Sequence, residues 1–193
     1  MRSTHVNRSA IRATAAGGVD PDWAWAPYAP DAERPWNLRL AGHLLRRAGF
    51  GAAWPELERA LAEGPGKTAD RLLAPPPGIE AFGAAYDEEE ASAGDSDSAD
   101  SLRAWWLHRM LATPYPLLEK MTLFWHGYFG VSNARVKSAA LMGRHLGLLR
   151  SHALGRFDAL LGAAVRDPAL LLSLEAGAQR KAQPATDFAR AFL

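Results

Sequence analysis

The chain has 193 residues, of which 48% are hydrophobic and 22% are charged, and a formal net charge of +1. This length suffices for one domain with a substantial core, and the composition excludes a protein that is disordered throughout. Cysteine is absent, which excludes disulfides and thiolate metal sites. Any metal would therefore need His, Asp or Glu as its ligands.

The N-terminal segment 1–35 is expected to be an extended leader or arm. Prolines interrupt any helix there, at Pro21, Pro27, Pro30 and Pro35. Aromatic residues are frequent in and just after this segment, at Trp23, Trp25, Tyr28 and Trp36. We expect the arm to lie across the folded body and to bury some of these rings.

No stretch has the apolar length of a signal peptide or the roughly 18 apolar residues of a membrane span. A soluble, cytoplasmic protein is therefore the default expectation.

From Asn37 onward, apolar residues recur at the three- and four-residue spacing of helices, and no alternating strand pattern or internal repeat occurs. The spacing predicts an all-α fold, an irregular array of about seven to eight helices. The segment Pro116–Gly130 is apolar around most of its circumference, which predicts a helix buried on all sides. The other expected helices cover 37–49, 55–64, 68–74, 101–112, 138–151, 157–166 and 168–175.

Residues 75–100 combine three prolines with a run of acidic residues and offer little apolar surface to bury. They predict a flexible acidic loop inside one helical domain, 36–193, although a boundary between two domains is the alternative.

The C-terminal residues also suggest a helix, because Phe188, Phe192 and Leu193 follow a capping residue at Thr186 or Asp187. We expect the chain to be the N-terminal portion of a longer domain, truncated at its C-terminus. Apolar surface left exposed from Pro168 onward would favour self-association.

Residues 103–193 carry twelve basic and five acidic side chains, and a basic surface can attract nucleic acid. The cations are spread over several elements and form no single basic run, which argues against nucleic-acid binding. The alternative is a contact with a missing acidic C-terminal half of the protein.

His126 is the best candidate for chemistry, because a partly buried imidazole on an aromatic helix can act as a base or a ligand. Its alternative is a core histidine bonded to a backbone carbonyl. Glu119, seven residues earlier, can share the His126 face or pair with an arginine. Glu175 and Arg190 flank a loop at Pro184 and are weak candidates for the same polar pocket.

The remaining polar and aromatic candidates are weaker. His43 with Arg46 and Arg47 can bind an anion or form a solvated face. His145 and His152 are seven residues apart and can face the same way. Four aromatic residues can form a cleft for a flat ligand or simply belong to the core: Trp105, Trp106, Phe124 and Trp125. No nucleotide-binding or nucleophile motif is present, so the sequence leaves the cofactor and the metal unknown.

Several motifs in order resemble a bacterial family, domain of unknown function 1800, from about Trp23 to the end. They are His43–Gly51, Leu102–Met110 with Thr113-Pro114, Glu119–His126, His152–Gly155, Asp167–Ala169 and Phe188–Arg190. The resemblance implies a largely helical protein, typically about twice this length or more, without an established activity. It also implies frequent export and a neighbouring gene of a sulfatase-like family.

The chain departs from the family pattern at several polar positions while it keeps the apolar ones. Gly127-Tyr128-Phe129 replaces the usual Asn-His-Phe, and His145-Leu146 replaces Gln-Asn. Near the end, Ala185, Thr186 and Ala191 stand where the family has Asn, Glu and Glu. The departures suggest a protein that folds like the family and lacks its polar site.

Two classes of function follow. The first is a non-catalytic interaction or scaffold protein that binds a protein partner through its aromatic arm and uncovered helix faces. The second is a fragment of a hydrolase-like, metal-assisted enzyme, with His126, Glu175 and Arg190 as contributors and further residues beyond the C-terminus.

Overall fold

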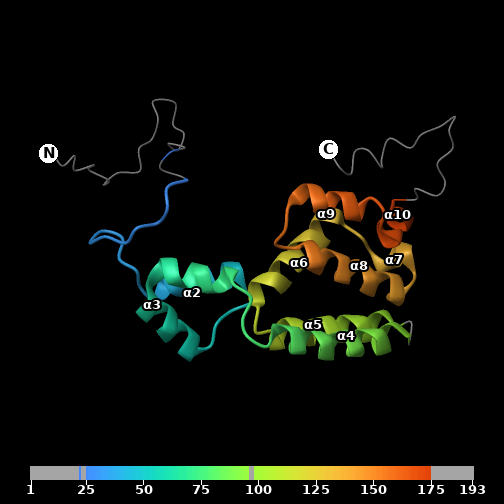
Figure 1. Ribbon diagram of the computed structural model, residues 1–193, viewed down its shortest axis with the longest axis horizontal. Helices are drawn as coiled ribbons and strands as arrows, with labels where there is room; N and C mark the ends of the chain where they lie inside the picture. The colour runs from blue at the N-terminus through green and yellow to red at the C-terminus, as the bar shows by residue number, and fades with distance from the viewer. Residues whose placement is uncertain (1–21, 23–24, 96–97, 175–193) are drawn as a thin grey trace.

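The computed structural model describes residues 22, 25–95 and 98–174, and all regular secondary structure in these residues is helical (Figure 1). The predicted all-α class is confirmed. The helices of the described part are α2 (Leu38–Ala48), α3 (Trp54–Leu73), α4 (Ile79–Asp95), α5 (Ala99–Ala112), α6 (Pro116–Phe129), α7 (Asn133–Val136), α8 (Ala139–His152), α9 (Phe157–Ala164) and α10 (Pro168–Ser173). The helix expected after Thr186 lies outside the described residues.

The helices α2 and α3 pack together around a small core of their own. Its buried residues are Ala41, Leu45, Ala60 and Leu72, and the indole of Trp36 donates to the Ala60 carbonyl at 3.0 Å. The two helices predicted over 55–64 and 68–74 form the single element α3, bent where Gly64 takes φ 79°. Glycine adopts this left-handed angle readily, and Pro65 then resumes the helix.

The acidic segment predicted as a flexible loop over 75–100 is largely helical, which corrects that prediction. The helix α4 covers most of it, and Phe82 and Tyr86, four residues apart, pack in the main core. The Trp105 indole donates to the Tyr86 carbonyl at 2.9 Å. The alanines between these rings and the glutamates after them are good helix formers, so two buried aromatics suffice to dock a helix that is otherwise rich in acidic residues.

The larger bundle is built around α8. Figure 1 shows α8 between the α4–α5 pair and α9, and the buried residues of α8 cover one broad face along its whole length. The prediction that Pro116–Gly130 is buried all round is therefore wrong: α8 holds the central position, and Phe124 and Tyr128 of α6 are half exposed. The predicted end of α6 is confirmed at Gly130, which takes φ 62°.

Of the aromatic rings in and just after the N-terminal arm that were expected to pack on the folded body, one described ring does so. Trp36 is partly buried against α3, whereas Trp25 is 88% exposed. Tyr28 is also exposed, and its hydroxyl donates to the Arg34 carbonyl within the arm. Trp23 lies outside the described residues.

Among the described helices, none is long and apolar enough to cross a membrane.

Candidate functional site

A buried ionic cluster ties three helices of the larger bundle together. Glu119 near the start of α6 is 1% exposed, and its Oε1 accepts from Arg109 Nε of α5 at 2.9 Å and from Arg150 Nε of α8 at 2.8 Å. The alternative that Glu119 pairs with an arginine is thus confirmed, with two partners. Both guanidinium groups lie within 6 Å of the Trp105 ring, 5.9 Å for Arg109 and 5.5 Å for Arg150.

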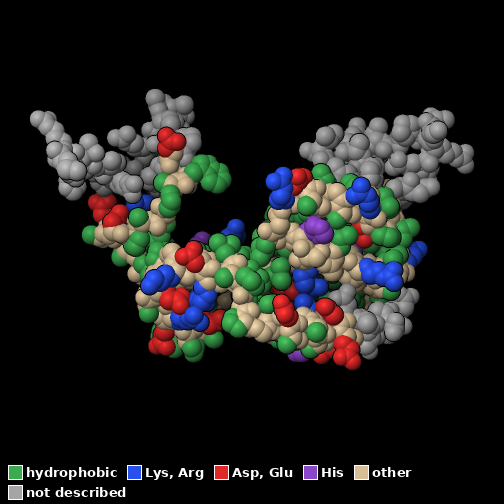
Figure 2. Space-filling model, in the orientation of Figure 1, with side chains coloured by type: hydrophobic (Ala, Val, Ile, Leu, Met, Phe, Trp, Pro, Cys, Tyr) green, Lys and Arg blue, Asp and Glu red, His purple; other side chains and the backbone are tan. Residues whose placement is uncertain are grey.

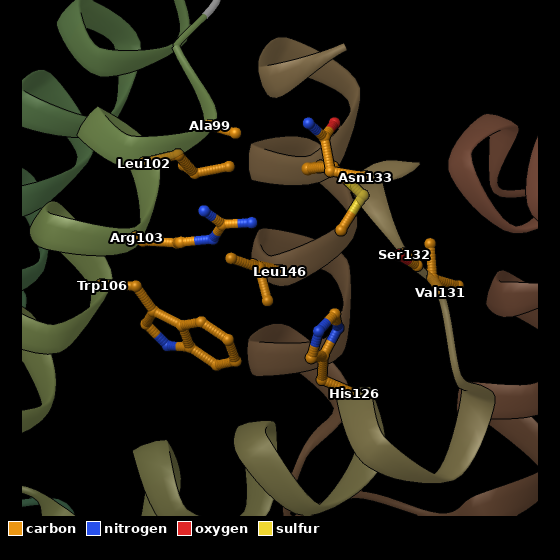
Figure 3. A pocket seen from close by; sticks show the side chains of 10 residues that line it. Ala99, Leu102, Arg103, Trp106, His126, Val131, Ser132, Asn133 and Leu146 are labelled. Atoms are coloured by element: carbon orange, nitrogen blue, oxygen red, sulfur yellow. The ribbon is translucent and has the colours of Figure 1, made fainter. Parts of the chain in front are cut away.

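His126 lies two helical turns beyond Glu119 on α6 and lines a hollow of about 210 Å³ between α5, α6 and α8 (Figure 3). The Trp106 indole stands edge-on to the imidazole with ring centres 5.3 Å apart. Figure 3 shows Arg103 and Asn133 extending toward the upper part of the same hollow. The other lining residues are Ala99, Leu102, Val131, Ser132, Met142 and Leu146.

A second imidazole lies next to His126. His145 of α8 is fully buried, with its ring centre 5.7 Å from that of His126. Its Nδ1 is 2.8 Å from Oδ2 of Asp167, which also accepts from Leu170 N as the N-cap of α10. Because an ionised carboxylate only accepts, Nδ1 of His145 carries a proton.

His145 and His152, which the seven-residue spacing allowed to face the same way, have separate partners. Nδ1 of His152 lies near the Leu148 carbonyl and the Ser151 hydroxyl, both on its own helix. The carboxylate partner of His145 is Asp167, the N-cap of α10. No spacing rule connects it with His145, 22 residues away, so only the folded structure reveals this pair.

The imidazole of His126 has no bonded carbonyl, contrary to the alternative of a satisfied core histidine. Its Nδ1 and the Nε2 of His145 are buried and have no hydrogen-bond partner in the described structure. Burial, and secondarily the neighbouring His145, lower the pKa of His126 from 6.5 to about 4. The His126 ring is therefore neutral at pH 7 and can act as a base or a ligand.

The lowered pKa of His126 predicts acid lability. The unfolded state takes up a proton near pH 6.5 and the folded state only near pH 4, so stability falls as pH drops through this window. His126 is partly exposed and solvent screens the effect, so we expect a loss of about 1–2 kcal/mol between pH 7 and pH 4. Urea unfolding at several pH values would measure it; a His126→Gln variant with the same pH slope would contradict it.

The remaining candidates are not part of this site. His43, Arg46 and Arg47 are exposed on α2, as expected for a solvated face. Glu175 and Arg190 lie outside the described residues. The four tryptophan and phenylalanine residues proposed for one cleft are divided: Trp105 is core, Trp106 walls the hollow, and Phe124 and Trp125 belong to a separate cluster.

That separate cluster, here called the aromatic face, consists of Phe124, Trp125 and Tyr128 of α6 with Phe157 of α9. The Trp125 and Phe157 rings stack with centres 5.6 Å apart, and Phe124 stacks on Tyr128 at 6.4 Å. Phe124, Tyr128 and Phe157 are 53%, 54% and 47% exposed. Figure 2 shows other hydrophobic side chains (green) between the α2–α3 pair and the larger bundle, with basic ones (blue) scattered over both.

The geometry thus defines an all-α protein with a partly buried imidazole pair beside a small hollow. A family model described as "Protein of unknown function (DUF1800)" matches residues 43–193, and the chain belongs to this family. Neither a curated protein nor a solved structure matches the chain. In the described residues, no group of three or more His, Cys, Asp or Glu could hold a metal ion.

Proposed function

We propose that this chain is a helical interaction protein that binds a protein partner through the aromatic face. The observation that carries the proposal is the mutual contact of three half-exposed rings from α6 and α9: Phe124 stacks on Tyr128, and Tyr128 meets Phe157 edge-on. Single exposed apolar residues are normal on a protein surface, whereas a contiguous group of aromatic rings marks an interaction site.

The aromatic face is large enough to provide the central contacts of an interface. The three half-exposed aromatic side chains together expose on the order of 300 Å² of mainly apolar surface. Burying this surface against a partner, at about 25 cal/mol per Å², contributes about 7 kcal/mol of binding free energy before the costs of association. The face is also preformed, because the Trp125 indole donates to the Ala153 carbonyl at 3.0 Å. An exposed ion pair, Arg156 with Asp158, lies at its edge and supplies part of a polar rim.

Site-specific photo-crosslinking tests this proposal. We expect a photoreactive residue at position 124 to form a discrete adduct with a partner in cells, and Phe157→Asp to reduce the adduct at least about tenfold. The matched control places the same residue at Leu111, which is 82% exposed on α5 outside the aromatic face. Equal adducts at both positions, or none at 124, would contradict the proposal; an adduct of twice the chain's mass would identify a second copy as the partner.

The second candidate function is the hydrolase-like, metal-assisted enzyme, and the hollow beside His126 favours it. A neutral, partly buried imidazole next to a tryptophan wall suits general-base chemistry on a small substrate. The contributions of Glu175 and Arg190 to such a site remain predictions. A panel of ester and phosphoester substrates would test this function, with hydrolysis lost in His126→Gln and kept in the exposed-histidine control His43→Gln.

A further inference from the structure

The two imidazoles of His126 and His145 present an arrangement that the interaction proposal does not use. One nitrogen of each ring, Nδ1 of His126 and Nε2 of His145, is buried without a hydrogen-bond partner. Leaving a buried polar nitrogen unsatisfied costs about 1–3 kcal/mol, and two such atoms on adjacent rings need an explanation. No hydrogen bond joins the two rings to each other.

The spacing of the rings fits a shared metal ion. Two imidazoles bound to one tetrahedral ion at about 2.0–2.1 Å per nitrogen have ring centres roughly 5–6 Å apart. The observed separation of the His126 and His145 ring centres is 5.7 Å, with the planes inclined at 60°. The ring-centre separation set by α6 and α8 thus lies within the range that two ligands of one ion adopt.

Asp167 supplies a further feature of metal-binding histidines. A ligating imidazole usually donates its other ring nitrogen to a carboxylate, which fixes the tautomer and the ring orientation. His145 makes this contact, with Nδ1 2.8 Å from Asp167 Oδ2, and both residues are buried. The proton on Nδ1 leaves the lone pair of a neutral His145 on Nε2, the unpartnered nitrogen.

We propose that His126 Nδ1 and His145 Nε2 together bind a divalent transition-metal ion such as zinc, with Asp167 orienting His145 from outside the coordination shell. Imidazole nitrogen suits zinc, cobalt and nickel, and does not suit magnesium or calcium, which prefer oxygen. The described residues offer no third His, Asp or Glu ligand, so water molecules complete the coordination. Such an open site resembles catalytic metal sites more than closed structural ones.

Zinc titration of the protein, prepared without a polyhistidine tag and treated with a chelator, tests the proposal. We expect calorimetry to show one zinc ion per chain and Co²⁺ to give the visible absorption of a tetrahedral nitrogen site. His126→Gln and His145→Gln are each expected to weaken zinc binding at least about tenfold, and Asp167→Asn about 10- to 100-fold. Asparagine keeps the helix cap at position 167, so this variant alters the charge behind His145 and preserves α10.

The exposed His43 and the partly buried His152 provide matched controls. His43→Gln and His152→Gln change histidines outside the imidazole pair and are expected to leave zinc affinity unchanged. Because His126 is only partly buried, the His126→Gln variant should fold. Its zinc affinity therefore tests the proposal even if the His145→Gln variant does not fold. Absence of zinc binding by the original protein, or unchanged binding by His126→Gln, would overturn the proposal. Because the aromatic face lies on other residues, neither result bears on the proposed interaction function.

Discussion

Glu119→Gln is expected to lower the free energy of unfolding by about 3–5 kcal/mol, the usual cost of removing one partner from a buried ion pair. The carboxylate of Glu119 faces two guanidinium groups that are themselves almost fully buried, Arg109 at 4% and Arg150 at 8% exposed. The neutral amide keeps the volume of Glu119 and loses its charge, so both guanidinium groups lose the carboxylate that they share. Urea denaturation followed by circular dichroism would measure the change.

A surface glutamate and a double variant complete this experiment. Glu58→Gln on the exposed side of α3 is expected to change stability by less than about 0.5 kcal/mol. Combining Glu119→Gln with Arg150→Met also removes one of the two cations that faced Glu119, so the double variant should lose less than the sum of the two single losses. A loss below about 1 kcal/mol for Glu119→Gln would show that water or rearrangement compensates the arginines.

Leu149→Ala is expected to destabilise the protein by about 2–5 kcal/mol, because the side chain is completely buried and its removal leaves a cavity. Leu149 lies on α8, the helix that contacts α4, α5, α6, α9 and α10, so the neighbouring helices cannot all move to fill the space. Thermal and urea unfolding would measure the loss.

The matched control for Leu149 is Leu172→Ala, which truncates the same side chain at a position that is 51% exposed. Its expected loss is about 1 kcal/mol or less. Equal losses at positions 149 and 172 would mean that α8 is not the rigid centre of the bundle.

The helices that were predicted well carry their start and stop signals within a few residues. Pro116 opens α6 and Gly130 closes it with φ 62°, and the Asp167-Pro168 pair caps and begins α10. The helix α4 was not predicted because its apolar pattern consists mainly of Phe82 and Tyr86 and is followed by a run of acidic residues. Only the presence of Trp105 and the rest of the core makes burial of these two rings favourable.

The residues of the candidate site were likewise predicted only where the signal lies within a short stretch of sequence. His126 was singled out from its place on an aromatic helix, and Glu119 from its spacing to His126. The spacing of His145 related it only to His152 on its own helix, whereas its neighbours in the fold are Asp167 and His126 from other elements. No local pattern relates these residues, because their proximity depends on how α6, α8 and α10 pack.

The sequence by itself determined the all-α class, the positions of most helix ends and the family, because helical spacing, caps and motifs act over short ranges of chain. The tertiary structure alone decided which helix lies at the centre, which aromatic rings stay exposed and which charges meet. Burial and pairing depend on contacts between segments far apart in the chain, and their free energy belongs to the packed arrangement rather than to any one helix.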